Sequence, residues 1–307
     1  MGSVDPAGLA AGFLTAILSA SSFLASSWAL KRTQGLTSPG LMMHAGLVMG
    51  LISLALLFPC GGTALFQNGV TTRLPIMLGA AAFFFLGQTS VFGAQKLVEP
   101  SRIVPLLGLK LPMLAFITVC FLGDSFSWIK AGAILLAVVA AFLLNNAGRH
   151  FPVASVVLVL AGCLFYCLSD LCLTALTNRL AADLHESQSL AALHCTILTY
   201  LTVGILALLS FAASPKTFGK TALVHSIPFS VFWLACIVTL NFCFARLGTL
   251  HGVLLQNTRG IFTLLLTPIC IALGCTALEN KLTGTLFAKR MAAAILVFLS
   301  VLLYQLG

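Results

Sequence analysis

The sequence predicts an all-α polytopic membrane protein with ten transmembrane helices arranged as two inverted five-helix repeats. Three observations predict it: the composition, ten apolar stretches of membrane-spanning length, and a motif that occurs once in each half. Of the 307 residues, 60% are hydrophobic and 7% are charged, whereas a soluble globular domain carries about 25% charged residues. So few charged side chains cannot cover a soluble surface, but they can mark the ends of helices whose sides face lipid.

Each apolar stretch is long enough to cross a bilayer. A hydrocarbon core about 30 Å thick requires about 20 helical residues, because each residue rises about 1.5 Å. The first basic residues, Lys31 and Arg32, follow the first stretch, so we expect a retained helix there rather than a signal peptide. The connecting loops are short and predict no soluble domain. The predicted spans are Gly8–Leu30, Gly40–Phe58, Leu74–Leu97, Arg102–Leu122, Ile129–Asn145, Val153–Leu176, Leu190–Phe211, Ile227–Phe244, Val253–Leu273 and Leu286–Leu306.

The net charge of +9 does not indicate a nucleic-acid partner. Basic residues occur one or two per loop, whereas a nucleic-acid-binding protein clusters them on one face among aromatic side chains. The observed distribution suits lipid headgroups. Eight of the ten cysteines fall within predicted spans and no CxxC pair occurs, so all ten are expected to be free thiols.

A motif near the end of each half suggests an internal repeat. Pro112 lies within a span that leads through an apolar run to Asp124, a polar turn and a further span. Pro268 leads in the same way to Glu279, a polar turn and the last span. The acid follows the proline by twelve residues in the first copy and by eleven in the second.

Each copy of this motif follows three earlier spans. Residues 1–150 and 151–307 are therefore predicted to be two five-helix repeats. Five is odd, so the second repeat must enter the membrane from the opposite side, and the two halves are related by an axis in the membrane plane.

On these residues the chain resembles the drug/metabolite transporter superfamily, in particular its ten-helix members built from two EamA-type halves. Asp124 stands where that family usually has a glutamate, and Glu279 keeps the glutamate in the second copy. The second half also has Leu255–Gly260 where Pro-Ser is expected, so the resemblance does not extend to a typical substrate. The residues that carry it are Leu97–Arg102, Leu111 and Pro112, Leu122–Asp124, and Gly132.

The resemblance implies ten helices, a central cavity between the halves, and alternating access without ATP. An independent argument makes Pro112 and Pro268 candidate hinges. Proline lacks an N–H and its ring clashes with the preceding turn, which loosens a helix and permits bending.

The orientation in the membrane is open. Nine basic residues follow odd-numbered spans and four follow even-numbered ones, which by the positive-inside rule places both termini outside the cytoplasm. The resemblance implies that both termini are cytoplasmic. Both arguments place the two termini on one side. The expected location is the cell membrane, as a multi-pass protein, or the inner membrane if the source is bacterial.

Asp170 is the most isolated charge within a predicted span. It lies in the first helix of the second half, with no charged residue within eight positions on either side. An ionised group near the bilayer centre costs about 2.5–3.5 kcal/mol on insertion scales, so it usually faces a cavity or a partner. Asp170 is therefore predicted either to bind a substrate amine or a proton, or to pair with a helix of the other half.

Two cations lie in the proline-bearing spans. Lys110 precedes Pro112 by two residues, and Arg259 precedes Pro268 by nine. Either could bind a carboxylate or phosphate, and a guanidinium can do so through two parallel hydrogen bonds. Either could also be the structural partner of Asp170.

Further polar residues within spans extend the predicted substrate site. His44 and His194 would suit proton coupling, because an imidazole titrates near neutral pH, although a hydrogen-bonded packing histidine is commoner. Neutral amides could bind substrate or join helices, and aromatic side chains could form a wall. These residues are Gln88, Asn241, Gln256 and Asn257, with Tyr166 and Trp28 as the aromatic candidates.

Together these features predict a secondary active transporter for a small polar metabolite, and the mixed charges favour an amino acid or related zwitterion. A carrier of an organic anion, or of a phosphorylated or nucleotide-linked metabolite, is the alternative, because the cations outnumber the acid. The sequence has no HExxH, GxSxG or Cys/His cluster to support an intramembrane enzyme. Short loops argue against a receptor or scaffold, while a channel would use similar residues.

This hypothesis requires no catalytic residue, metal or cofactor. Proton coupling or substrate exchange would drive transport. The expected partners are the small-molecule substrate and membrane lipid. Small residues spaced four apart, such as Gly46 with Gly50, are interpreted as helix-packing positions, and the chain is expected to be a monomer or a weak homodimer.

Overall fold

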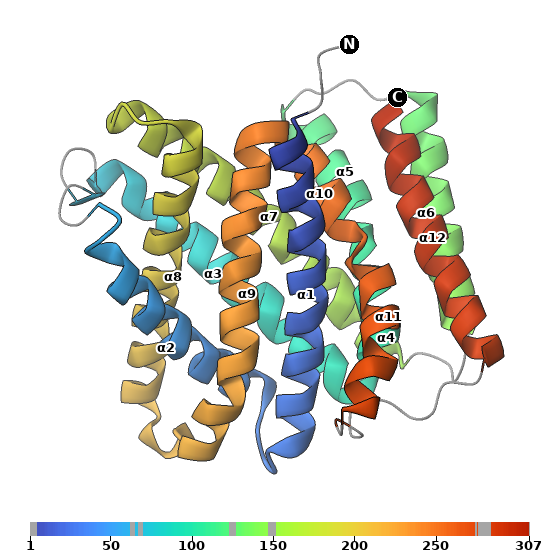
Figure 1. The fold of residues 1–307 in the computed structure, drawn as a ribbon, viewed down its shortest axis with the longest axis horizontal. Coiled ribbons are helices and arrows are strands. Elements are labelled where there is room, and N and C mark those ends of the chain that lie inside the picture. The colour runs from blue at the N-terminus through green and yellow to red at the C-terminus, as the bar shows by residue number, and fades with distance from the viewer. Residues whose placement is uncertain are drawn as a thin grey trace.

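The computed structural model describes residues 5–61, 65–66, 70–122, 127–146, 152–273, 275 and 284–306, and across these the chain is helical without strands. Figure 1 shows the helices packed as one bundle. The elements are α1 (Pro6–Arg32), α2 (Ser38–Leu57), α3 (Val70–Leu97), α4 (Pro100–Leu106), η2 (Leu107–Leu109), α5 (Lys110–Leu122), α6 (Trp128–Asn146), α7 (Val153–Asp183), α8 (Gln188–Ala213), η3 (Pro215–Thr217), α9 (Lys220–Leu247), α10 (Thr249–Asn257), α11 (Arg259–Ala272) and α12 (Gly284–Leu306).

Within the described residues, seven helical segments are long and apolar enough to cross a membrane. The all-helical class is confirmed, and the length and composition of these segments suit a membrane-embedded protein. Large apolar side chains such as Leu208 and Leu209, which are 53% and 61% exposed, lie on the outside of these helices, where lipid solvates them. The segments are Pro6–Arg32, Ser38–Leu57, Thr71–Leu97, Val153–Asp183, Gln188–Ala213, Lys220–Leu247 and His251–Ala272.

Polar residues explain where several helices begin. Asp5, Thr37 and Ser187 precede α1, α2 and α8, and each side chain accepts a hydrogen bond from a backbone N–H two or three residues later. Such a cap satisfies one of the N–H groups that the first turn of a helix leaves without a partner.

The helices pack in pairs that join the two halves of the sequence. α1 packs along α9, α3 along α7, α2 along α8, α6 along α12, and α4 on α11. Figure 1 shows α1 beside α9 in the centre and α6 with α12 at one edge. Each pair joins a helix before residue 150 to one after it, so the halves interlock.

α2 and α8 approach each other most closely where both carry glycine. A Cβ added to Gly50 would lie 2.5 Å from the Cα of Gly204, so neither position has room for a side chain. One turn earlier, Gly46 faces Val203 and Ala207. The interpretation of Gly46 and Gly50 as helix-packing positions is therefore confirmed.

The two proline-bearing spans are interrupted, whereas the sequence predicted continuous helices. The predicted span Arg102–Leu122 consists of α4, the 3₁₀ turn η2 and α5, and Val253–Leu273 consists of α10 and α11 joined at Thr258. Pro105 and Pro112 flank the first interruption, and each lacks the N–H that an α-helix would bond to the carbonyl four residues earlier.

At the second interruption the Thr258 hydroxyl donates to the Leu255 carbonyl at 2.7 Å. Ser22 and Ser26 make bonds of the same kind inside the continuous α1, so this bond accompanies the break without explaining it. Pro268 lies farther along, inside the continuous α11. Pro112 is the third residue of α5, where an N–H would have no helical partner. The interruptions therefore precede both predicted hinge prolines. The motif acids Asp124 and Glu279 lie outside the described residues.

Candidate functional site

The two interruptions meet inside the bundle, where α4 packs on α11. A Cβ added to Gly260 of α11 would lie 3.1 Å from the Cα of Pro105 in α4. Lys110 is the first residue of α5 and Arg259 the first of α11, and their side chains are only 2% and 1% exposed. A helix N-terminus carries partial positive charge, so each cation adds to that charge.

Lys110 pairs with Asp170 from α7. The Lys110 ammonium forms a salt bridge to Asp170 Oδ2, and the two side chains are 3% and 7% exposed. The ammonium also donates to Gln256 Oε1 at 3.4 Å and lies 5.9 Å from the centroid of the Tyr166 ring. Asp170 thus has a partner in the first half of the chain, which is one of the two arrangements that the sequence suggested.

Arg259 has no such carboxylate. Its Nη2 donates to the Leu107 carbonyl in η2 at 3.4 Å, and its guanidinium carbon lies 5.5 Å from the centroid of the Phe23 ring. Arg259 Nε has no hydrogen-bond partner, and no acidic side chain in the described part of the chain forms an ion pair with this guanidinium. Lys110, Arg259 and Asp170 together therefore carry one positive charge in excess.

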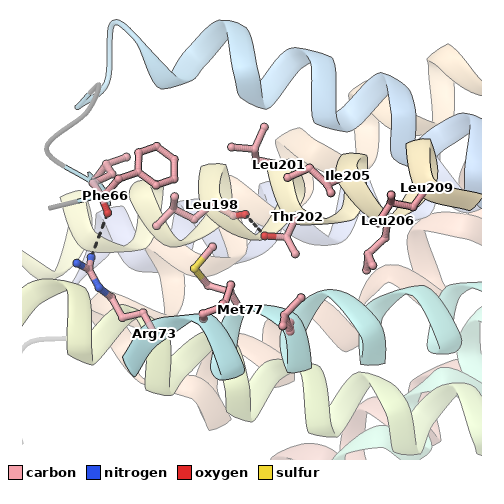
Figure 2. Close-up of a pocket in the computed structure, with 12 residues that line it drawn as sticks. Phe66, Arg73, Met77, Leu198, Leu201, Thr202, Ile205, Leu206 and Leu209 are labelled. Carbon is pink, nitrogen blue, oxygen red and sulfur yellow. Dashed lines mark hydrogen bonds between the residues drawn. The ribbon is translucent and has the colours of Figure 1, made fainter. Parts of the chain in front are cut away.

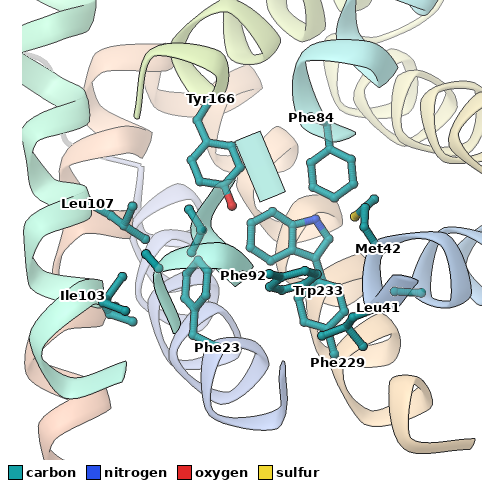
Figure 3. Close-up of a cluster of buried hydrophobic side chains, with 14 of the residues drawn as sticks. Phe23, Leu41, Met42, Phe84, Phe92, Ile103, Leu107, Tyr166, Phe229 and Trp233 are labelled. Atoms are coloured by element: carbon teal, nitrogen blue, oxygen red, sulfur yellow. The ribbon is translucent and has the colours of Figure 1, made fainter. Parts of the chain in front are cut away.

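Aromatic side chains lie beside these charges, and Figure 3 shows Trp233 among Phe84, Tyr166 and Phe229. The Trp233 ring stacks on those of Phe84 and Tyr166 at centroid distances of 5.5 and 6.1 Å. Its Nε1 donates to the Tyr200 hydroxyl at 2.7 Å. No sequence motif pointed to Trp233, Tyr200 or Phe84. Only the position of Trp233 could have indicated a role in the site: it lies midway along α9, whereas membrane tryptophans concentrate at the interfaces.

A small cavity lies between the charges and the aromatic wall. Its volume of about 20 Å³ corresponds to roughly one water molecule. A metabolite therefore requires the helices around the cavity to move apart. The lining residues are Phe84, Lys110, Tyr166, Ser169, Asp170, Leu173, Tyr200, Trp233, Ile237, Leu240, Gln256 and Arg259.

The predicted site residues fall into two groups. Lys110, Asp170, Arg259, Tyr166 and Gln256 converge on this cavity. Gln88 is joined to it, because its Oε1 accepts a hydrogen bond from the Tyr166 hydroxyl at 2.5 Å while its Nε2 has no partner among the described residues.

Asn257 stands beside the second interruption. It is 5% exposed, and both polar atoms of its amide lack a partner among the described residues.

The remaining predicted residues are not part of the cavity. Asn241 donates to the Thr196 hydroxyl at 2.7 Å and so joins α9 to α8. His44 and His194 lie near the starts of α2 and α8 and contact loops. Trp28 packs edge-on against His225, with centroids 4.9 Å apart, rather than on the aromatic wall.

A second, larger groove runs between α3 and α8 (Figure 2). Its volume is about 280 Å³, and leucines, Ile205 and Met77 dominate its lining. Several of these side chains are exposed on the outside of the bundle, including Leu74 at 45% and Leu78 at 44%. Such a surface matches a hydrocarbon chain better than a polar metabolite, so we place the candidate site at the smaller, charged cavity.

Comparison with known proteins adds support for the fold. No known protein family and no curated protein matches the sequence. Among solved structures, 28 chains match the fold. One crystal structure aligns over 98% of each chain with a TM-score of 0.61 at 15% sequence identity. At this identity the likeness is one of fold alone.

Proposed function

We propose that this chain is a secondary active transporter that moves a small polar metabolite across a membrane by alternating access. The observation that carries the proposal is the charge cluster of Lys110, Asp170 and Arg259, buried where two interrupted helices meet. Interrupted helices with exposed half-helix ends at the interface of two repeats are a recurring way to build substrate sites in carriers. We extend the proposal to membership of the drug/metabolite transporter superfamily.

The packing supports two inverted five-helix halves, with the α4–α5 and α10–α11 pairs each counted as one span. An axis that relates the two halves would map α1 onto α7 and α9 onto α3. The pair of α1 with α9 would therefore become the pair of α7 with α3. It would also exchange the pair α4 with α11 for the pair α10 with α5, and it would leave the pairs α2 with α8 and α6 with α12 unchanged. All six pairs are in contact. Each interruption lies in the fourth span of its half, three to five residues before Pro112 in the first half and ten residues before Pro268 in the second.

The proposed mechanism uses the interruptions as bending points. Both precede the cationic residues, so bending there moves Lys110 and Arg259 relative to Asp170 on the continuous α7. The observed conformation is occluded, since its cavity holds roughly one water molecule. Opening one end at a time would expose the same charges first to one side of the membrane and then to the other.

Two substrate classes fit the charges in different ways. A zwitterion would place its carboxylate on Arg259 and its amine on Asp170, displacing Lys110. An organic anion or phosphorylated metabolite would bind Arg259 and leave the Lys110–Asp170 pair intact. The anion has a specific observation in its favour, because Arg259 lacks a carboxylate while Asp170 already has a cation.

The test is binding and uptake by the purified chain. A thermal-shift screen against amino acids, organic acids, amines, nucleosides, phosphorylated metabolites and nucleotide sugars identifies ligands, because a compound that binds only the folded state raises the unfolding temperature. Uptake of each hit into proteoliposomes then follows. We expect Arg259→Gln to lower uptake of either class by about tenfold or more, the effect of losing a charge-assisted hydrogen bond.

Asp170→Asn separates the two classes. It should abolish uptake of a zwitterion but leave uptake of an organic anion largely intact. Asp5→Asn and Arg246→Gln are matched controls, since this exposed pair at the bundle surface lies 3.5 Å apart and away from the cavity. Full uptake by both Asp170→Asn and Arg259→Gln would sink the proposed site.

A further inference from the structure

His44 and His194 occupy equivalent places in the two halves. Each lies seven residues after the residue that caps the second helix of its half, Thr37 for α2 and Ser187 for α8. Both rings are buried, with 0% and 4% of the residue exposed. α2 and α8 run antiparallel through their Gly50–Gly204 contact, so the two histidines lie at opposite ends of the bundle.

His194 ties its end of the bundle together through two acceptors. Its Nδ1 lies 2.9 Å from Glu186 Oε1, and its Nε2 bonds to the Cys60 carbonyl oxygen in the segment that follows α2. Glu186 is held by a turn in which His185 has φ 51° and the Glu186 N–H donates to the Ala181 carbonyl at 3.2 Å. The contact thus joins the first half of the chain to the second.

His44 makes the corresponding contact at the other end, with different chemistry. Its Nδ1 lies 2.7 Å from the Gly40 carbonyl, and its Nε2 accepts a hydrogen bond from the Gly219 N–H at 3.1 Å. The rings of Phe211 in α8 and Phe218 in the α8–α9 loop pack against the imidazole. This contact again joins the two halves.

The two contacts require opposite protonation. His194 faces two acceptors. A neutral imidazole and an ionised Glu186 carry one proton between them, so closing that end requires a second proton, on either His194 or Glu186. His44 faces one acceptor and one donor, which is the pattern of a neutral imidazole protonated at Nδ1. A proton added to Nε2 would point at the Gly219 N–H and break the contact.

Other charged groups surround both contacts. At the His194 end, Arg73 forms a 3.4 Å ion pair with Asp183, and Arg179 donates to the Thr72 carbonyl. His185 and Cys60 also lie at this end of the bundle. At the His44 end, exposed Lys216 and Lys220 flank the Gly219 loop, and His225 bonds to the Thr33 hydroxyl at 2.7 Å.

We propose that His194 with Glu186 and His44 are two gates of opposite pH dependence, one at each membrane face. Closing the His194 gate takes one proton from the water at that face, and opening it returns the proton there. Protonation of His44 opens its own gate. Acid therefore favours the conformation closed at His194 and open at His44, and alkali favours the reverse. As gates of a carrier they rest on the proposed function.

Amide hydrogen exchange tests the gates without substrate or transport. The purified chain is exchanged at several pD values, and peptides covering residues 56–61 and 215–221 are followed by mass spectrometry. At a given pD, an unprotected amide exchanges at the same chemical rate in the wild type and in the variants. The ratio of their measured exchange rates therefore reports how often the structure opens. We expect acid to protect the 56–61 segment and alkali to protect the 215–221 segment in the wild type.

Substitutions of the gate residues show which side chain causes each pD dependence. His194→Gln and the milder Glu186→Gln should each remove the pD dependence at 56–61, and His44→Gln should remove that at 215–221. Each loss should be about tenfold in protection, the scale of one hydrogen bond to a charged group. His225→Gln, at the same end as His44 but outside the gate, should leave both segments unchanged.

The gates are overturned if wild-type protection is independent of pD, if both segments respond in the same direction, or if the 56–61 dependence survives in both Glu186→Gln and His194→Gln. Because the exchange needs no substrate, failure of uptake in proteoliposomes would count against the carrier and leave the exchange result standing. Uptake without pD-dependent protection would retain the carrier and remove the gates.

Discussion

At the scale of single residues, buried charge governs both stability and the candidate function. Lys110 and Asp170 are each less than a tenth exposed, so either one alone would be an uncompensated ion inside the bundle. Arg259 is 1% exposed, yet its guanidinium donates to a backbone carbonyl and forms no ion pair with a carboxylate of the described chain. Mutual neutralisation is enough to explain why Lys110 and Asp170 are both buried. The Arg259 guanidinium has no carboxylate partner in the described chain, which points to a ligand.

A double-mutant cycle measures how far the Lys110–Asp170 pair is structural. Asp170→Asn should lower the free energy of unfolding by about 3–5 kcal/mol, because it leaves the Lys110 ammonium buried without its carboxylate. Adding Lys110→Met should recover most of that loss, since an apolar replacement removes the unpaired charge. The measurement is reversible unfolding in mixed micelles.

If the loss of unfolding free energy in the double variant equals the sum of the losses in the two single variants, Lys110 and Asp170 are not coupled. A double variant that regains stability but still fails to take up substrate would assign the charges to transport rather than to folding.

At the scale of helices, close contact and interruption decide the architecture. α2 and α8 meet at glycines, and α4 and α11 meet where each neighbours an interruption. The first kind of contact fixes two continuous helices against each other along their length. The second leaves two helices able to bend beside the charges.

Gly50→Leu tests the fixed contact. The side chain would overlap the backbone of Gly204, because even a Cβ would lie 2.5 Å from its Cα. We expect a loss of about 1–3 kcal/mol or more in unfolding free energy, the range for overpacking. Gly132→Ala is the matched control, as among the described residues its added Cβ would meet Leu303 alone, at 4.0 Å, and it should be neutral or slightly stabilising. Equal effects of the two changes would refute the close contact.

At the scale of the whole molecule, the number of crossings decides the topology. Seven segments qualify as spans by length and composition within the described residues, whereas the proposed inverted repeat requires ten. Figure 1 places the first turn of α1 and the last turn of α12 at the same edge of the bundle. An even number of crossings would produce this arrangement.

We predict that both termini lie on the same side of the membrane. Epitope tags at each end, tested for protease access in sealed vesicles of known orientation, measure this directly. Ten crossings give the two tags the same accessibility, and seven would give opposite accessibility. The same assay decides between the loop charges, which place both termini outside the cytoplasm, and the family resemblance, which places both inside it.

The sequence by itself determined the helical membrane class, because apolar runs of bilayer length have one stable form in lipid. It also selected Lys110, Asp170 and Arg259, because charge is rare enough in such runs to stand out. Sequence could not show that the two proline-bearing spans are interrupted before their cations. Each break is only one to three residues long, so it leaves the length and apolar character of its span unchanged.

Only the tertiary structure decided which polar residues share a site. It separated His44 and His194 from the central charges and added Trp233 and Tyr200 to them. The physical reason is that every polar residue within a span seeks a partner, and whether that partner lies across a cavity or in a loop depends on how distant helices pack.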